Sequence, residues 1–119
     1  MDAFIYTVDD SVATVQYEER ADSFAEQFAA ILEEVAAAGV REVLLDNGDM
    51  PPTRYKDALA DGKLIARRLV SRGVRLAVLM RDDDHSTKII MAAAALEGAT
   101  IMIGRDRQEA YDWLRGHIK

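Results

Sequence analysis

The spacing of apolar and polar positions changes several times along the 119-residue chain, and each spacing predicts a different element. Two segments near the start, Phe4–Val8 and Val12–Tyr17, are rich in β-branched and aromatic residues. Between them, Asp9–Ser11 has the composition and length of a hairpin turn. We therefore predict that the chain opens with a β-hairpin.

From Ser23 onward, apolar residues recur every three or four positions, which is the period of an amphipathic helix. Ser23 and Glu26 have the spacing of a capping box at its start, and Gly39 is suited to its end. The short apolar run Val43–Asp46 then predicts a strand that is buried on both faces.

A second helix is predicted from a cap at Thr53 to about Ser71. Its predicted inner face consists of Tyr55, Leu59, Gly62, Ile65, Ala66 and Leu69. On that face, Gly62 would let another element approach closely.

The same reasoning predicts a strand at Leu76–Met80 and a helix that ends at Leu96. The chain then closes with a strand at Thr100–Ile103 and a helix that starts at Asp106 and carries Ala110, Trp113, Leu114, His117 and Ile118 on one face.

This order of elements predicts an α/β fold. A hairpin followed by repeated strand–helix units gives a single mixed five-stranded sheet, antiparallel at the hairpin and parallel elsewhere, covered by four helices. No linker, repeat or low-complexity segment interrupts the pattern, so we predict one domain over residues 1–119.

Composition removes several kinds of chemistry. The chain has no cysteine, which excludes disulfides, thiol catalysis, iron–sulfur clusters and thiolate zinc sites. No apolar stretch approaches the roughly 20 residues that span a bilayer, so we expect no stable membrane insertion and a cytoplasmic location. There is also no strand-turn-helix Gly-x-Ser-x-Gly elbow and no phosphate-cradling glycine motif, and we predict neither an enzyme nor a bound cofactor.

Charge is unevenly distributed along the chain. The formal net charge is −6, which argues against a general nucleic-acid binder. Residues 1–50 carry 12 acidic and 2 basic side chains, whereas residues 51–119 carry 9 acidic and 13 basic ones. The basic excess gathers around the predicted second helix, where Lys56, Lys63 and Arg67 share a face away from the apolar stripe. We interpret this face either as a solvated surface or as an electrostatic docking surface for an acidic partner. Nucleic acid or anionic lipid is a weaker alternative, since only Tyr55 is interleaved with the charges.

The segment Ile89–Leu96 would be apolar on every side of a helix, and such a helix needs cover on more than one face. Three roles remain open: a covered core helix, a homodimer contact, or the wall of a pocket for a small apolar ligand. Together with the loops at the carboxyl ends of the strands, it supplies the candidate contact residues Asp46, Asn47, Met50, Asp84, His85, Ile90, Met91, Ala94 and Ala95.

The acidic run Asp82–Asp84, followed by His85, could in principle bind a hard cation together with Asp46. Consecutive loop residues cannot all point at one ion, however, and acids in this position also stabilise a helix N-terminus. We therefore predict no metal site, and we keep a metal-dependent enzyme as the third functional alternative.

The elements at this length resemble the SpoIIAA-like branch of the STAS superfamily, the anti-sigma-factor antagonist fold, which is related to CRAL-TRIO lipid-carrier domains. The residues that carry the resemblance are the opening hairpin, the Val43–Asp46 strand with its loop, Gly73–Leu79, and the closing Glu109–Leu114 with its Trp-Leu pair. The resemblance implies a non-catalytic regulatory or protein-interaction module that often forms dimers, and a carrier of a small lipid-like ligand is the alternative. The antagonists carry a phosphorylatable Ser in an Asp-Ser-Ser-Gly-like turn. Here the segment reads Met50–Arg54, and only Thr53 transfers, as a phosphoacceptor position.

Overall fold

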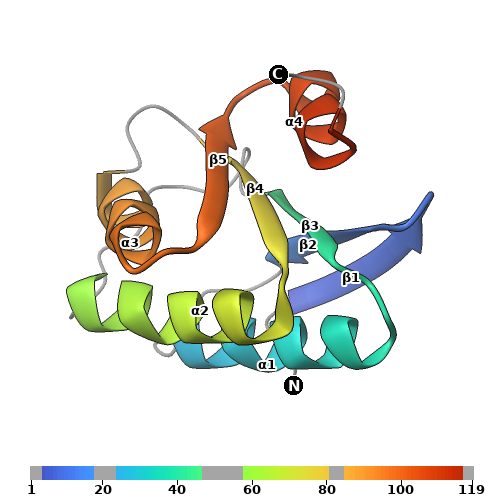
Figure 1. The fold of residues 1–119 in the computed structure, drawn as a ribbon. Coiled ribbons are helices and arrows are strands. Elements are labelled where there is room, and N and C mark those ends of the chain that lie inside the picture. Colours follow the sequence, from blue (N-terminus) through green and yellow to red (C-terminus); the bar gives the residue numbers. More distant parts are fainter. Residues whose placement is uncertain (1–3, 18–23, 47–57, 81–84, 117–119) are drawn as a thin grey trace.

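A computed structural model describes residues 4–17, 24–46, 58–80 and 85–116, in which five strands and four helices alternate along one sheet (Figure 1). In chain order they are β1 (Phe4–Asp9), β2 (Val12–Tyr17), α1 (Phe24–Ala37), β3 (Glu42–Asp46), α2 (Ala58–Arg72), β4 (Arg75–Leu79), α3 (His85–Leu96), β5 (Thr100–Gly104) and α4 (Arg107–Leu114). The predicted α/β class and the order of the elements are confirmed.

The opening hairpin turns over two residues. Asp10 and Ser11 have φ angles of 52° and 69°, and two consecutive positive φ values are what a type I′ turn requires. Asp tolerates this left-handed region better than most side chains, because its short polar group bonds to nearby backbone. The turn sets the antiparallel register, in which Asp9 lies opposite Val12 and Tyr6 opposite Val15.

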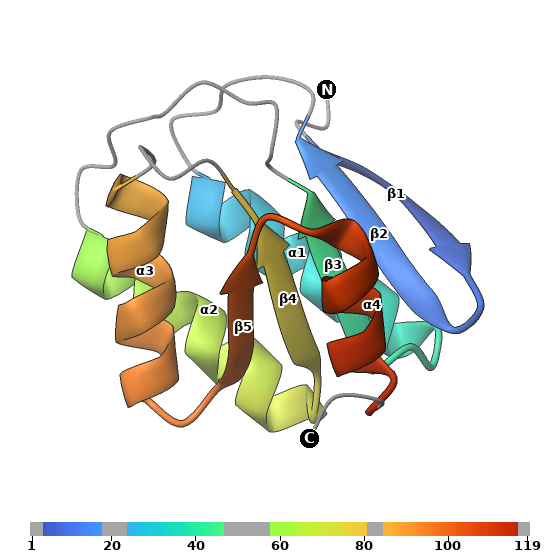
Figure 2. The same ribbon diagram turned by 90° about the horizontal axis from the view of Figure 1, so that it is seen from above.

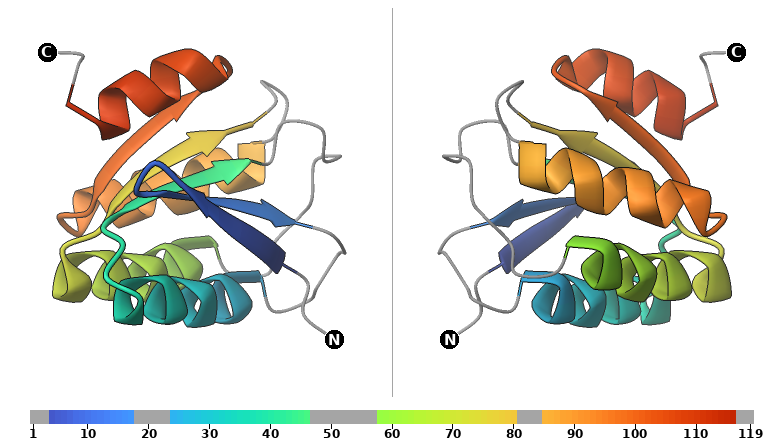
Figure 3. Two further views of the ribbon diagram at one scale, coloured as in Figure 1. Left: turned by 90° about the vertical axis from the view of Figure 1, so that its right-hand side faces the viewer. Right: turned by 90° about the vertical axis from the view of Figure 1, so that its left-hand side faces the viewer.

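The sheet has the order β1-β2-β3-β4-β5, and every pairing after the hairpin is parallel. Sequential parallel strands must each be joined by a crossover, and α1, α2 and α3 are those crossovers. Because the handedness of such connections is constant, all three helices lie on one face of the sheet, while α4 lies on the other (Figures 2 and 3).

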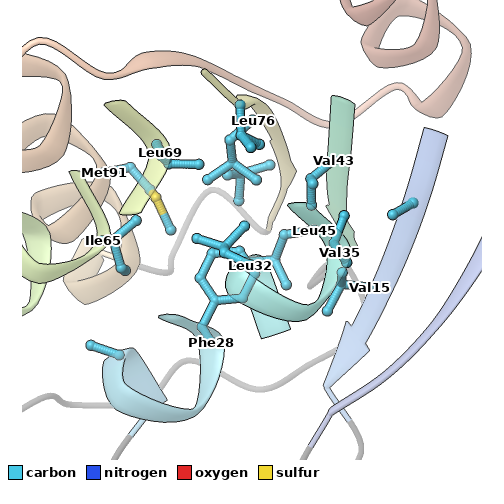
Figure 4. Packing of buried hydrophobic residues seen from close by; sticks show 14 of the residues in the cluster. Val15, Phe28, Leu32, Val35, Val43, Leu45, Ile65, Leu69, Leu76 and Met91 are labelled. Atoms are coloured by element: carbon cyan, nitrogen blue, oxygen red, sulfur yellow. The ribbon is translucent and has the colours of Figure 1, made fainter. Parts of the chain in front are cut away.

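The two faces carry separate cores. Val43 and Leu45 of β3 point toward the three crossover helices, whereas Leu44 points toward α4, and all three are fully buried. This alternation confirms the prediction of a strand buried on both faces. Figure 4 shows the larger core, where Phe28 of α1 and Met91 of α3 meet side chains from α2 and the sheet.

The final helix is shorter than its sequence pattern predicts. The Asp106 carboxylate caps its start by accepting hydrogen bonds from the backbone N–H groups of Gln108 and Glu109, at 2.9 and 3.2 Å. The helix ends at Leu114, and the following Gly116 takes a left-handed φ of 76°. Ala110 and Leu114 are buried as expected, whereas the expected His117 and Ile118 lie outside the described residues.

The two helices α2 and α3 cross at Gly62. A Cβ atom placed there would lie 2.6 Å from both the Ala93 Cβ and the Ile90 carbonyl oxygen. This confirms that Gly62 serves close approach. The prediction of Leu59 as a core residue is wrong: its side chain is 63% exposed. Leu59 lies in the first turn of α2, about one turn before the point where α3 meets this helix at Gly62.

Candidate docking groove

A hollow of about 500 Å³ lies beside α2, beyond its crossing with α3. Lys63, Ala66, Arg67, Val70, Ser71 and Glu97 line it, and we call these six residues the α2–α3 groove. Five of them come from one stripe of α2, and Glu97 follows the last residue of α3. The two helices come closest at Gly62 of α2 and at Ile90 and Ala93 of α3, and Figure 2 shows that they lie at an angle to each other.

The groove has an apolar floor between polar walls. Ala66 is buried where it lines the groove, and Val70, which also lines it, is 55% exposed. A second hollow of about 240 Å³ shares Val70 and continues past Gly98 to Thr100. The second hollow therefore adjoins the groove at Val70, on the side of β5.

Two of the three predicted docking residues, Lys63 and Arg67, line the groove together, and both are exposed. The third, Lys56, lies outside the described residues. None of the ion pairs found within the described part of the chain includes Lys63 or Arg67. Their charges are therefore available to a ligand that enters the groove.

Other cations of α2 are already used within the fold. The Arg72 guanidinium donates to the Glu33 carboxylate of α1 at 2.7 and 3.0 Å, and Arg68 lies 3.6 Å from the same group. The hydrogen bond from Arg72, and the charges of both arginines, hold the pKa of Glu33 below its usual value. The acidic first half of the chain and the basic second helix thus meet within one molecule at this pair.

The apolar contact expected of α3 needs correction. Ile90 and Met91 are fully buried in the main core, and Ala94 is fully buried as well, so a partner or ligand cannot reach them in this structure. Of the three roles considered for this helix, the structure shows that this face of α3 belongs to the covered core. Ala95 is exposed, and so are Ile89 and Leu96, at 50% and 89%. The side of α3 open to a partner is therefore the opposite one.

At the carboxyl edge of the sheet, Asp46 is paired with Arg107 at the start of α4, and its side chain is only 15% exposed. His85 is exposed at the first position of α3. The remaining candidates at this edge, Asn47, Met50, Thr53 and Asp84, lie outside the described residues. Asp46 thus has a structural role in holding α4.

Sequence analysis assigned no role to Arg75. Its guanidinium donates to the carbonyl oxygens of Leu114 and Trp113, at 2.9 and 2.6 Å, and lies 4.7 Å from the centre of the Trp113 ring. It thereby adds hydrogen bonds to the last carbonyls of α4, of which that of Trp113 also accepts from the Gly116 N–H at 3.1 Å. The Trp-Leu pair was the one sequence feature that marked the end of this helix as a packing site. Nothing in the sequence shows which cation contacts it.

Sequence analysis also missed Glu97 as a lining residue of the groove, although it directly follows Leu96, where α3 ends.

Among the described residues, no group of three or more His, Cys, Asp or Glu side chains is placed to hold a metal ion. Asp82 and Asp83 of the acidic run fall outside that description. None of the described helices is long and apolar enough to cross a membrane.

Comparisons with known proteins show the fold and nothing finer. No protein-family model and no curated protein matches the chain. Among solved structures, it is similar to the NMR structure of the protein TM1081, with a TM-score of 0.64 and 18% sequence identity. The match covers 92% of this chain and 86% of that one. The likeness therefore spans nearly the whole of this mixed α/β fold.

Proposed function

We propose that the chain is a cytoplasmic, non-enzymatic regulatory or protein-interaction module of the SpoIIAA-like type, which docks a partner protein in the α2–α3 groove. The observation that carries the proposal is the pair Lys63 and Arg67, exposed beside the apolar floor of Ala66 and Val70. An apolar centre with a charged rim is the usual composition of a protein docking surface. The element order adds support, since a hairpin followed by parallel units is the fold that the resemblance implies.

A homodimer remains part of the proposal, and its expected contact moves to the outward side of α3. Ile89, Ala92 and Leu96 are exposed at helical spacing on that side. Native mass spectrometry of the purified protein tests the dimer, and Ala92→Arg should dissociate it. A wild-type protein of monomer mass at all concentrations would remove the dimer from the proposal.

The partner is tested by crosslinking in cells that make the protein naturally. A photoreactive benzoylphenylalanine at position 71 places the probe in the groove, and one at Thr7, exposed on β1, is the control. We expect a discrete protein adduct from position 71, none from position 7, and loss of the adduct when Lys63→Glu and Arg67→Glu are added. An adduct of lipid mass at position 71 would instead support the alternative of a carrier, and the absence of any adduct would contradict docking in the groove.

A further inference from the structure

The α2–α3 groove has a regular spacing that restricts what fits it. Lys63, Ala66, Arg67, Val70 and Ser71 follow one another at intervals of three, one, three and one along α2. They form a straight stripe about 12 Å long, since each helical residue rises about 1.5 Å. A ligand that uses the whole stripe therefore presents about two turns of helix or a comparable extended length.

Charge and apolar surface alternate along this stripe. Lys63 and Arg67 lie four residues apart, so their side chains leave the same side of α2 one turn from each other. Ala66 and Val70 have the same separation and lie beside them. The stripe therefore holds a pair of cations and, beside it, a pair of apolar residues, and the two members of each pair lie one turn apart.

We propose that the partner segment is an acidic amphipathic helix with carboxylates four residues apart and an apolar residue beside them. This inference rests on the proposed docking function and names the chemistry of its partner. Carboxylates at that spacing match the one-turn separation of Lys63 and Arg67, while the apolar side chain covers Val70. Helices of this kind commonly bind by laying an apolar face into a groove.

Glu97 at the end of α3 restricts where the acidic residues of the partner helix can lie. Glu97 precedes Gly98, which lines the second hollow together with Val70 and Thr100. The groove is therefore positive along Lys63 and Arg67 and negative beside Glu97. A third carboxylate on the partner would be repelled at Glu97, so the acidic part of the helix lies over the two cations.

The probes are two synthetic 16-residue helical peptides, labelled with a fluorophore and followed by anisotropy with the full-length protein. The acidic peptide carries two glutamates four residues apart beside a leucine, and the basic peptide has lysines in their place. The protein has a net charge of −6, so non-specific attraction would favour the basic peptide. We expect the wild type to prefer the acidic one.

Two matched double variants locate the contact. Lys63→Gln with Arg67→Gln should weaken binding of the acidic peptide about tenfold, the effect of losing two exposed ion pairs together. Arg68→Gln with Arg72→Gln removes the same charge from the same helix outside the groove and should leave binding within about twofold. Lys63→Glu with Arg67→Glu should invert the preference, so that the basic peptide binds better.

The inference is overturned if the wild type prefers the basic peptide, or if the two glutamine double variants lose affinity equally. In that case, an adduct at position 71 that still depends on Lys63 and Arg67 would leave the docking function standing with a partner of another chemistry. Failure of both experiments would remove the docking function itself.

Discussion

At the crossing of α2 and α3, replacing Gly62 by alanine is expected to destabilise the protein, although the same replacement usually stabilises a helix. Replacing glycine by alanine in the middle of a helix normally stabilises it by about 1 kcal/mol, because the unfolded chain loses freedom. At Gly62 the new Cβ would lie 2.6 Å from the Ala93 Cβ and from the Ile90 carbonyl oxygen. Favourable carbon contacts begin near 3.5 Å, so the helices must separate by about 1 Å.

The magnitude follows from these two opposing terms. Overpacking of a well-packed core costs about 1–3 kcal/mol, and the upper part of that range applies because neither the Ile90 carbonyl oxygen nor the Ala93 Cβ can move away by a change of rotamer. Subtracting about 1 kcal/mol of helix propensity leaves Gly62→Ala less stable by about 1–2 kcal/mol. With a slope of about 1.5 kcal/mol per molar urea, the unfolding midpoint should fall by about 1 M.

Urea unfolding followed by circular dichroism measures this shift. Ala60→Gly, at an exposed position of the same helix, is the control for propensity alone and should cost about 1 kcal/mol. Combining Gly62→Ala with Ala93→Gly removes one of the two clashes, so the pair should show a favourable coupling of about 0.5–1 kcal/mol. An unfolding midpoint for Gly62→Ala at or above that of the wild type would refute the close crossing.

Two further predictions concern the contacts that hold the outer elements. Arg75→Met removes both hydrogen bonds to the end of α4, so stability should fall by about 2 kcal/mol and the emission of Trp113, the single tryptophan, should shift to the red; unchanged emission would contradict the contact. The Tyr6 hydroxyl donates to Glu34 at 3.0 Å, and this bond raises the pKa of Tyr6 above its ordinary value of 10.0. Its stabilisation is therefore complete below pH 10 and is lost as pH rises through the raised pKa. Glu34→Leu removes the acceptor and should lower the pKa of one of the four tyrosines toward its ordinary value, measured by ultraviolet absorbance, and identical titration curves would contradict the bond.

Local features were predictable because neighbouring residues decide them. The turn at Asp10 and Ser11 and the cap at Asp106 depend on the backbone preferences and short side chains of a few residues. The strand at Val43–Leu45 was also predictable, since a continuous apolar run of that length needs cover on both faces. The class of fold then followed from the order of such elements.

The candidate site was predictable only in part. Lys63 and Arg67 could be placed on one polar face from their spacing, and the structure adds that this face borders a hollow. The apolar residues of α3 could not be divided into inner and outer sets, because a helix with no polar side carries no directional signal. Ile90 and Leu96 look alike in sequence, yet one is fully buried and the other is 89% exposed.

The sequence by itself determined the elements, their order and the gathering of positive charge on the second helix, because these depend on residues close together along the chain. Only the tertiary structure decided which charges stay available. Arg72 meets Glu33 across 39 positions, Arg75 meets the end of α4 across a similar separation, and Lys63 and Arg67 are left facing the groove. Such pairings depend on how the packed helices place distant side chains, and the close crossing of α2 and α3 at Gly62 is itself a contact between residues far apart in the chain.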